Sequence, residues 1–260
     1  MEATRAKRRA AVTAVALIAL SCCALSGCAR SAPAASPLPS ASAQSSSTQS
    51  VSPTPTVPAF DRTLLSHDDP NSLWVISNKH RPLNPADFAP SDLSMPVGVP
   101  NEFTQPLREA AARAVETMYT DAVAQGANFG IISAYRDFGT QVSLYNRYVA
   151  RDGQEAADTY SARPGHSEHQ TGLAVDFDDG GDCYLNACFE STAAGQWLAA
   201  NAANYGFVLR YPNGQDAITG FTYEPWHFRY IGVAAAQAMR DSGTPTLEQF
   251  FGLEPAPGYL

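Results

Sequence analysis

Lysine is scarce in this 260-residue chain, which has only Lys7 and Lys79. A serine peptidase of the penicillin-binding type needs an S-x-x-K motif and a K-T-G motif. Ile76 stands three residues before Lys79, and neither lysine begins a K-T-G sequence, so that catalytic class is excluded. Positive charge is also low overall, since the formal net charge is −8. This balance argues against a protein that binds nucleic acid through its phosphates.

Long apolar runs are missing near the N-terminus as well. The run from Ala10 to Leu20 is shorter than the roughly 20 residues that a membrane-spanning helix needs. It follows four basic residues at positions 5–9, a pattern typical of an export signal. The segment ends in Leu25-Ser26-Gly27-Cys28, which resembles the lipobox of bacterial lipoproteins, whose cysteine is acylated. An ordinary secretory peptide cleaved at a nearby small residue is the alternative.

The lipoprotein interpretation has consequences for charge and location. Cleavage before Cys28 removes residues 1–27, with one acidic and four basic side chains, and changes the net charge to −11. Such an acidic chain does not bind an anionic membrane surface by charge, so the lipid would hold it there. We therefore expect a protein of the bacterial cell envelope, on the extracytoplasmic side and anchored to the membrane by its lipid.

Cysteine is also infrequent, with five residues in the chain. Cys22 and Cys23 would leave with the signal peptide, and Cys28 would carry the lipid. Cys183 and Cys188 remain, and two nearby cysteines of an exported protein are expected to form a disulfide. The alternative, a zinc clamp, would need further thiols that the chain does not have.

The chain divides into three parts by composition. Residues 1–27 form the expected signal peptide, and residues 28–58 form a tether rich in Ser, Pro, Ala and Thr. Positions 31–58 carry no charge and no aromatic side chain, so we expect a disordered linker. Its reach is about 90 Å when extended and about 30 Å as a flexible coil. Residues 59–260 have the composition of one globular domain.

Periodicity within the domain predicts both helices and strands. Apolar residues recur at helical spacing before Gly126, namely Leu107, Ala111, Val115, Met118 and Ala122. Helices are predicted for residues 105–125, 140–150, 191–204 and 233–240, and strands for residues 129–134, 173–177, 207–210 and 226–231. Because helices and strands mix without regular βαβ alternation, the predicted fold class is α+β.

Five histidines bear on the chemistry. His67 and His80 lie in polar sequence, and we interpret both as solvated surface residues. The other three gather in two polar segments, Arg163-Pro-Gly-His166-Ser-Glu-His169-Gln-Thr-Gly-Leu-Ala-Val-Asp176 and Glu224-Pro-Trp-His227-Phe-Arg-Tyr.

Strand periodicity places some of these side chains on opposite faces of a sheet. Val175 and Phe177 would face the core and Asp176 the other side, while Pro225 allows an irregular backbone between Glu224 and His227. Two imidazoles and one carboxylate, with a fourth position left to water, form the ligand set of a catalytic zinc site. The alternative from the spacing alone is that the two histidines and the aspartate are unrelated.

Several motifs together resemble one known family. Ser167-x-His169-x2-Gly172-x-Ala174-x-Asp176 followed by Glu224-x2-His227 is similar to the zinc D-alanyl-D-alanine carboxypeptidases of the VanY type. Three other stretches show the same resemblance: Ser133-Ala-Tyr-Arg136 with Gln141, Asn78-Lys79 with Pro82-Leu83, and Gly206-Phe207 with Arg210-Tyr211-Pro212. The resemblance covers roughly residues 73–232 and implies an α+β fold of the Hedgehog/DD-peptidase type.

The resemblance also implies residue roles. His169, Asp176 and His227 would bind one zinc ion, Glu224 would be the general base, and Arg136 would stabilise the transition state. Four more residues lie in the matching segments and would hold the terminal carboxylate of the peptide or serve as loop hydrogen bonders: Ser167, Gln141, Ser133 and Arg163. His166 is left without a role, because a further ligand would overfill the site.

The resulting functional hypothesis is a peptidase that removes the terminal D-Ala from peptidoglycan stem peptides, acting as a monomer. An L,D-carboxypeptidase and a wall endopeptidase share the same metal chemistry and remain open. A non-catalytic wall-binding lipoprotein that keeps zinc for stability is the alternative from another class. The presence of both Glu224 and Arg136 argues against it, because binding alone needs neither.

Overall fold

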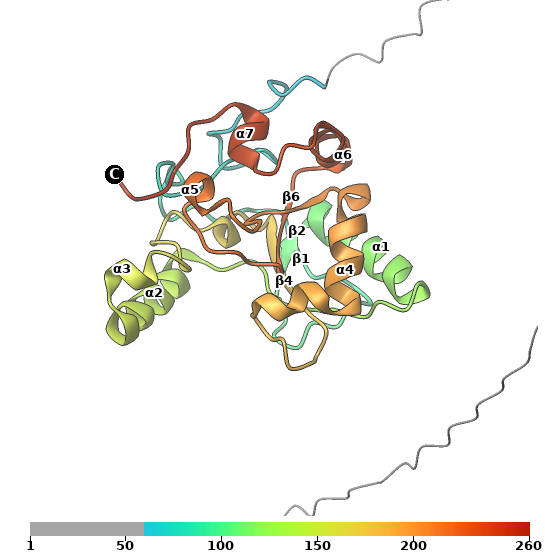
Figure 1. The fold of residues 1–260 in the computed structure, drawn as a ribbon. Helices are drawn as coiled ribbons and strands as arrows, with labels where there is room; N and C mark the ends of the chain where they lie inside the picture. The colour runs from blue at the N-terminus through green and yellow to red at the C-terminus, as the bar shows by residue number, and fades with distance from the viewer. Residues whose placement is uncertain (1–59) are drawn as a thin grey trace, which may run out of the picture. The chain divides into compact units, whose positions relative to one another are not determined.

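The structure is a computed structural model that describes residues 60–260 (Figure 1). The expected signal peptide, Cys28 and the tether to residue 58 lie outside the described residues. The helices and strands follow in this order: β1 Leu93–Ser94, β2 Leu107–Arg108, α1 Glu109–Ala124, β3 Gly130–Ser133, α2 Phe138–Asp152, α3 Gln154–Ala157, the 3-10 helix η1 Glu168–Thr171, β4 Ala174–Asp178, η2 Ala187–Ser191, α4 Ala193–Asn201, η3 Ala202–Tyr205, β5 Phe207–Leu209, α5 Asp216–Thr219, β6 His227–Tyr230, α6 Val233–Ser242 and α7 Leu247–Phe251.

A four-stranded sheet organises the described residues. Its strand order is β3-β4-β6-β5, and every neighbouring pair is antiparallel. A separate ladder joins β1 to β2. The mixture of helices with an antiparallel sheet confirms the predicted α+β class. None of the helices between residues 60 and 260 is long and apolar enough to span a membrane.

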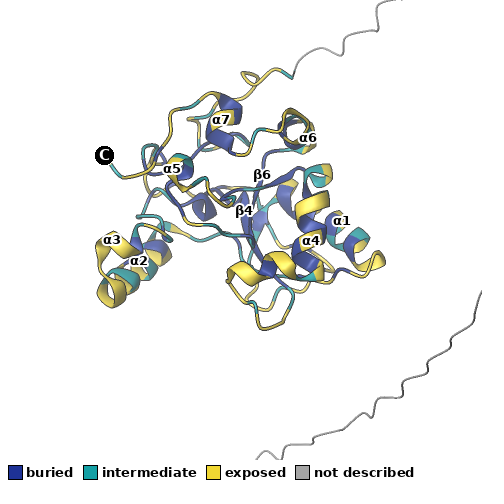
Figure 2. Ribbon diagram, in the orientation of Figure 1, coloured by how far each residue is buried: buried dark blue, intermediate teal, exposed yellow. Residues whose placement is uncertain are grey.

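The sheet separates two apolar cores. Val175, Phe177 and Phe228 point from the sheet into the larger core, which also contains the buried faces of α1 and α4. Val208 and Ile231 belong to the smaller core, which includes residues of α6 and α7. Figure 2 shows these helices dark on their inner sides and exposed on their outer sides. As the alternation predicts, Val175 and Phe177 pack into the core while Asp176 lies on the other face.

Every helix and strand expected from the periodicity has a counterpart, and the differences lie at the ends. The helix expected from residue 105 begins only at Glu109, because Leu107–Arg108 pair with β1 instead. The helix expected over 191–204 is interrupted, since Thr192 caps α4 by accepting a hydrogen bond from the Gly195 amide. A 3-10 turn then takes over at Ala202–Tyr205.

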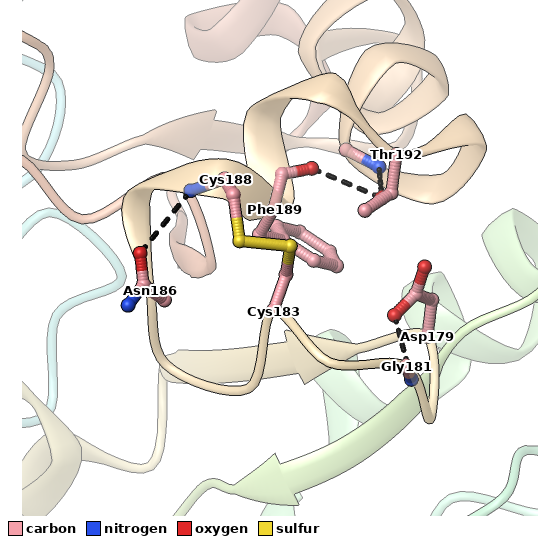
Figure 3. The surroundings of a disulfide bond; sticks show 8 residues. Asp179, Gly181, Cys183, Asn186, Cys188, Phe189 and Thr192 are labelled. Atoms are coloured by element: carbon pink, nitrogen blue, oxygen red, sulfur yellow. Dashed lines mark hydrogen bonds between the residues drawn. A yellow bond between two sulfur atoms is a disulfide. The ribbon is translucent and has the colours of Figure 1, made fainter.

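The loop after β4 is closed by the disulfide between Cys183 and Cys188, the pairing that the sequence predicts. The Cα atoms of the two cysteines lie 5.4 Å apart. Figure 3 shows the bridge beside Phe189, whose side chain is fully buried. The Phe189 carbonyl accepts a hydrogen bond from the Thr192 amide, which ties this loop to the start of α4. The disulfide thus fixes the loop at the edge of the cavity described below.

Candidate active site

A cavity of about 460 Å³ opens on the sheet face opposite the larger core. Its walls come from segments far apart in the chain, including α2, η1, β4, the disulfide loop and the approach to β6. Six of the predicted functional residues line it: Arg136, Ser167, His169, Asp176, Glu224 and His227. The sheet therefore collects in one place residues that are up to 91 positions apart.

Strand pairing places the three predicted metal ligands side by side. Asp176 and His227 are direct partners on β4 and β6. His169 lies in η1, and Gly172 turns the chain from η1 into β4 with a positive φ of 69°. The amide of Gly172 donates to the His169 carbonyl across this turn. A side chain at Gly172 would be strained by this positive φ and would also crowd the side chains of Arg108 and Leu93, so glycine is favoured there.

The distances within the triad suit a metal ion. Asp176 Oδ2 lies 3.3 Å from His169 Nε2, and Asp176 Oδ1 lies 3.0 Å from His227 Nδ1. Ligand atoms about 2.0–2.1 Å from a tetrahedral zinc ion lie about 3.3 Å from one another. Asp176 Oδ1 is buried without a hydrogen-bond partner. A buried carboxylate oxygen normally has a partner, and a metal ion bound here would supply one. The triad therefore fits a zinc-type ion.

Hydrogen bonding fixes which nitrogen of His169 is free. Its Nδ1 lies 2.7 Å from the carbonyl oxygen of Ala134. A carbonyl can only accept, so Nδ1 carries the proton and Nε2 is left as a ligand atom directed at Asp176.

In the absence of a metal, the three side chains of the triad shift one another's pKa values. Burial would raise the pKa of Asp176, but the imidazoles of His169 and His227 hold that pKa well below its usual range. Burial would lower the pKa of His227, yet the nearby carboxylates of Asp176 and Glu168 raise it to about 9. A pKa above neutrality favours the protonated imidazole in the metal-free protein, so metal binding at this site would release a proton.

Glu224 lies beside the triad, but its carboxyl group is farther from His227 than the carboxyl group of Asp176 is. Its Oε2 lies 3.6 Å from His227 Nδ1, and its side chain is 12% exposed. The turn from Glu224 to His227, closed by a hydrogen bond between their backbones, brings the carboxyl onto the same side as the imidazole. Burial raises the pKa of Glu224 to about 8. A carboxyl group with a raised pKa next to a metal position is suited to general base and acid chemistry.

Arg136 also lines the cavity, and hydrogen bonds hold it at three points. Its Nη1 donates to Gln141 Oε1 at 2.9 Å, and its Nη2 donates to Ser133 Oγ at 2.7 Å. Its backbone amide donates to the His169 carbonyl. A guanidinium fixed in this way can offset negative charge that develops in the cavity without moving.

The other predicted substrate-binding residues divide into two groups. Ser167 lines the cavity. Ser133 and Gln141 are not among the cavity-lining residues; both accept a hydrogen bond from the Arg136 guanidinium, and Gln141 is 1% exposed.

Arg163 and His166 also lie outside the cavity lining. Arg163 pairs with Asp158 at 2.8 Å, and its guanidinium packs over the ring of Tyr259. The structure thus places Arg163 in an ion pair beside Tyr259, outside the cavity lining. His166 Nδ1 contacts the Asn78 carbonyl at 2.7 Å and takes no part in the triad.

The sequence did not identify one wall of the cavity. Leu144, Tyr148 and Arg151 project into it from α2. Their spacing of four and three residues places them on one helix face, but no motif in the sequence marked that face as functional. Glu168 also lines the cavity, and the sequence predicted no role for it because it occupies the unspecified position between Ser167 and His169 in the motif.

The interpretation of His67 as a solvated residue was wrong. Its ring packs against Phe251 at 4.4 Å and lies 6.3 Å from the ring of Trp74. Burial lowers the pKa of His67, which favours the neutral imidazole in this aromatic setting. His80 is half-buried.

Two imidazoles and a carboxylate at metal-binding distance, with a second carboxyl and a fixed guanidinium on the same cavity, define the site of a metal-dependent peptidase. Residues 104–233 match the family model of VanY, D-alanyl-D-alanine carboxypeptidase. The chain belongs to the VanY family of carboxypeptidases, as its motifs predict.

Known proteins share both sequence and fold with this chain. The protein YodJ of Bacillus subtilis (strain 168) is 38% identical over 189 residues, which are 70% of this chain and 68% of YodJ. The structure of the LD-carboxypeptidase LdcB matches with a TM-score of 0.65 and 38% identity, covering 70% of this chain and 87% of that chain. A mutant of the VanY D,D-pentapeptidase from a VanB-type resistance cassette, in complex with Zn(II), matches with a TM-score of 0.58 and 28% identity, covering 69% and 98%.

Proposed function

We propose that this protein is a zinc-dependent carboxypeptidase that hydrolyses the terminal D-Ala-D-Ala bond of peptidoglycan stem peptides. One zinc ion would be held by His169 Nε2, Asp176 and His227 Nδ1. The observation that carries the proposal is the triad itself, whose ligand atoms all lie within 4.8 Å of one another beside Glu224. The family match and the Zn(II) complex of a structural neighbour support it.

The proposed chemistry assigns separate roles to the ion and to the side chains. A bound zinc ion lowers the pKa of its water to about 7 and polarises a carbonyl group. Glu224 accepts the proton of the attacking water and passes it to the leaving amine. Arg136 offsets the negative charge that grows on the carbonyl oxygen. Ser167, on the cavity wall, is proposed to hold the terminal carboxylate of the peptide.

A second candidate is L,D-carboxypeptidase activity, in which the bond before a single terminal D-Ala is cut. It is favoured by the LD-carboxypeptidase LdcB, which is more similar to this chain than the VanY D,D-pentapeptidase, at 38% against 28% identity. The triad and Glu224 serve either reaction equally, so the difference would lie in the walls that meet the peptide on either side of the scissile bond.

Mass spectrometry of defined substrates distinguishes these activities. The purified protein, loaded with zinc, is incubated separately with pentapeptide stems, tetrapeptide stems and cross-linked dimers. Loss of one alanine from the pentapeptide supports the leading proposal, whereas loss from the tetrapeptide supports the L,D activity. Cleavage of the dimer alone would identify an endopeptidase. No cleavage of any substrate would contradict all three and favour a wall-binding protein.

We also propose that the protein works as a monomer at the extracytoplasmic face of the membrane, held by a lipid on Cys28. The support is the Leu25-Ser26-Gly27-Cys28 sequence together with the uncharged Ser- and Pro-rich segment that follows it. A tether of this composition would let the domain reach stem peptides at a distance from the bilayer.

A further inference from the structure

Four charged side chains form a buried group behind the triad. They come from η1, the end of β5, β6 and α7, and are Glu168, Arg210, Arg229 and Glu248. Side-chain exposure is 0% for Glu168, Arg210, Arg229 and Glu248. Two carboxylates and two guanidiniums balance one another within this group. An ion pair so deeply buried is costly unless each charge is matched, so its presence calls for a reason other than stability.

Glu168 is the member of the group that faces the metal ligands. Its Oε1 accepts a hydrogen bond from Arg210 Nε at 2.9 Å and lies 3.0 Å from Arg229 Nη1. Its Oε2 has no hydrogen-bond partner, although it is buried. One oxygen of the carboxylate is thus held by two arginines, and the other can still accept a hydrogen bond.

A second unpartnered atom lies opposite this oxygen. His227 Nε2 is buried without a hydrogen-bond partner, and it is 3.9 Å from Glu168 Oε2. A buried polar atom without a hydrogen-bond partner destabilises the folded state, because it has lost its water and gained nothing in return. A small shift of either side chain would join them in one hydrogen bond and remove both costs.

The identity of the donor follows from the other imidazole nitrogen. His227 Nδ1 is the atom that faces Asp176, at 3.0 Å. If Nδ1 binds the metal, the proton of the neutral ring must be on Nε2, which then needs an acceptor. His169 has such an acceptor in the Ala134 carbonyl. For His227, Glu168 Oε2 occupies the equivalent place.

We propose that Glu168 is a positioning residue of the metal centre, which accepts the Nε2 proton of His227 and keeps Nδ1 directed at the metal. Arg210 and Arg229 hold the carboxylate in place, and Arg229 lies on the same face of β6 as His227, two residues further along. This inference rests on the proposed zinc site. Two consecutive residues of η1 would then serve the metal site: His169 binds the ion directly, and Glu168 orients the second histidine ligand, His227 on β6.

The group also connects the C-terminal helix to the site. Arg210 donates two hydrogen bonds to Glu248 of α7, at 2.9 and 2.6 Å. Glu248 Oε1 further accepts from Asn78 Nδ2 at 3.0 Å. Glu248 therefore accepts from the two terminal nitrogens of Arg210, whereas Glu168 accepts from its Nε.

Zinc affinity tests the proposal without reference to catalysis. We compare the parent, Glu168→Gln and the matched control Glu248→Gln by competition for zinc with a chromophoric chelator. Glu168→Gln should weaken zinc binding about 10–100-fold, the usual effect of removing an outer acceptor of a ligating histidine. Glu248→Gln removes a carboxylate from the same Arg210 but leaves His227 untouched, and it should bind zinc as the parent does.

Equal zinc affinity of Glu168→Gln and the parent would overturn the proposal, and so would an equal loss in both variants, which would indicate general destabilisation. A parent that binds no zinc would instead overturn the proposed function. Because Glu168→Gln could fail to fold, the parent alone provides a second test by nitrogen-15 NMR. His227 in the zinc-loaded parent should carry its proton on Nε2, in slow exchange with water. A proton on Nδ1 would contradict the proposal.

Discussion

Replacement of Glu224 by Gln separates catalysis from metal binding at a single residue. Gln keeps the size and hydrogen-bonding reach of the side chain but cannot accept a proton from water. Glu224 Oε2 lies 3.6 Å from His227 Nδ1, farther than Asp176 Oδ1 at 3.0 Å. We therefore expect zinc stoichiometry equal to that of the parent. Turnover should fall about 10²–10⁴-fold, the usual contribution of a positioned general base, which is about 3–5 kcal/mol in activation free energy.

The same variant has an expected effect on stability. Burial raises the pKa of Glu224 to about 8 in the metal-free protein, from an ordinary value of 4.5. An acid whose pKa is raised by folding lowers the stability of the folded state as pH rises from 4.5 to 8, because the unfolded chain ionises first. Gln does not titrate, so the metal-free variant should gain stability relative to the metal-free parent across this range.

Stem-peptide hydrolysis, metal analysis and thermal unfolding at several pH values on the same preparations measure these effects. Glu190→Gln is a matched control, because Glu190 contacts Tyr223 outside the cavity lining and should leave turnover and zinc unchanged. Undiminished turnover in Glu224→Gln would remove Glu224 from the mechanism. Loss of zinc from it would make Glu224 a ligand, and a stability difference independent of pH would refute the assigned pKa.

Three further predictions concern other parts of the chain. Arg136→Lys keeps the charge but loses the two-point anchoring of the guanidinium, so turnover measured by steady-state kinetics should fall more than about tenfold with zinc content unchanged; equal turnover would contradict this. Joint replacement of Cys183 and Cys188 by Ser should lower the free energy of unfolding by about 2 kcal/mol, measured by urea denaturation, and a larger loss with collapse of the fold would be inconsistent with so short a loop. Cys28→Ala should move the protein from the membrane fraction to the medium with its peptidase activity intact, and continued membrane association after salt washing would refute lipid anchoring.

The sequence predicted the strands of the sheet because they follow from local rules, and the three residues that the family resemblance implies as metal ligands lie together in the structure. Alternation in Ala174–Asp178 places Asp176 opposite the core, and the antiparallel register then brings it beside His227. The Gly172 turn similarly follows from the need for a left-handed conformation between η1 and β4. In these places periodicity and turn chemistry determine which face of the sheet each side chain occupies and where the chain turns.

The remaining features depend on contacts between segments far apart in the chain. Ser133 and Gln141 belong to a motif with Arg136, and the motif alone could not tell whether they contact a ligand or hold the guanidinium. Arg163 forms an ion pair with Asp158 and packs over the ring of Tyr259, which is 96 residues away in the chain. The buried partners of Glu168 come from β5 and β6, and no local pattern connects them.

Metal dependence of hydrolysis tests the central claim most directly. The purified protein is stripped with a chelator, and D-alanine release from stem peptides is followed as zinc is added back, with His169→Ala in parallel. We expect no release without metal and full recovery at one zinc ion per chain. The His169→Ala variant, which lacks one ligand, should neither bind zinc tightly nor recover. Undiminished hydrolysis by the stripped protein, or full recovery of His169→Ala, would contradict a zinc centre built from His169, Asp176 and His227.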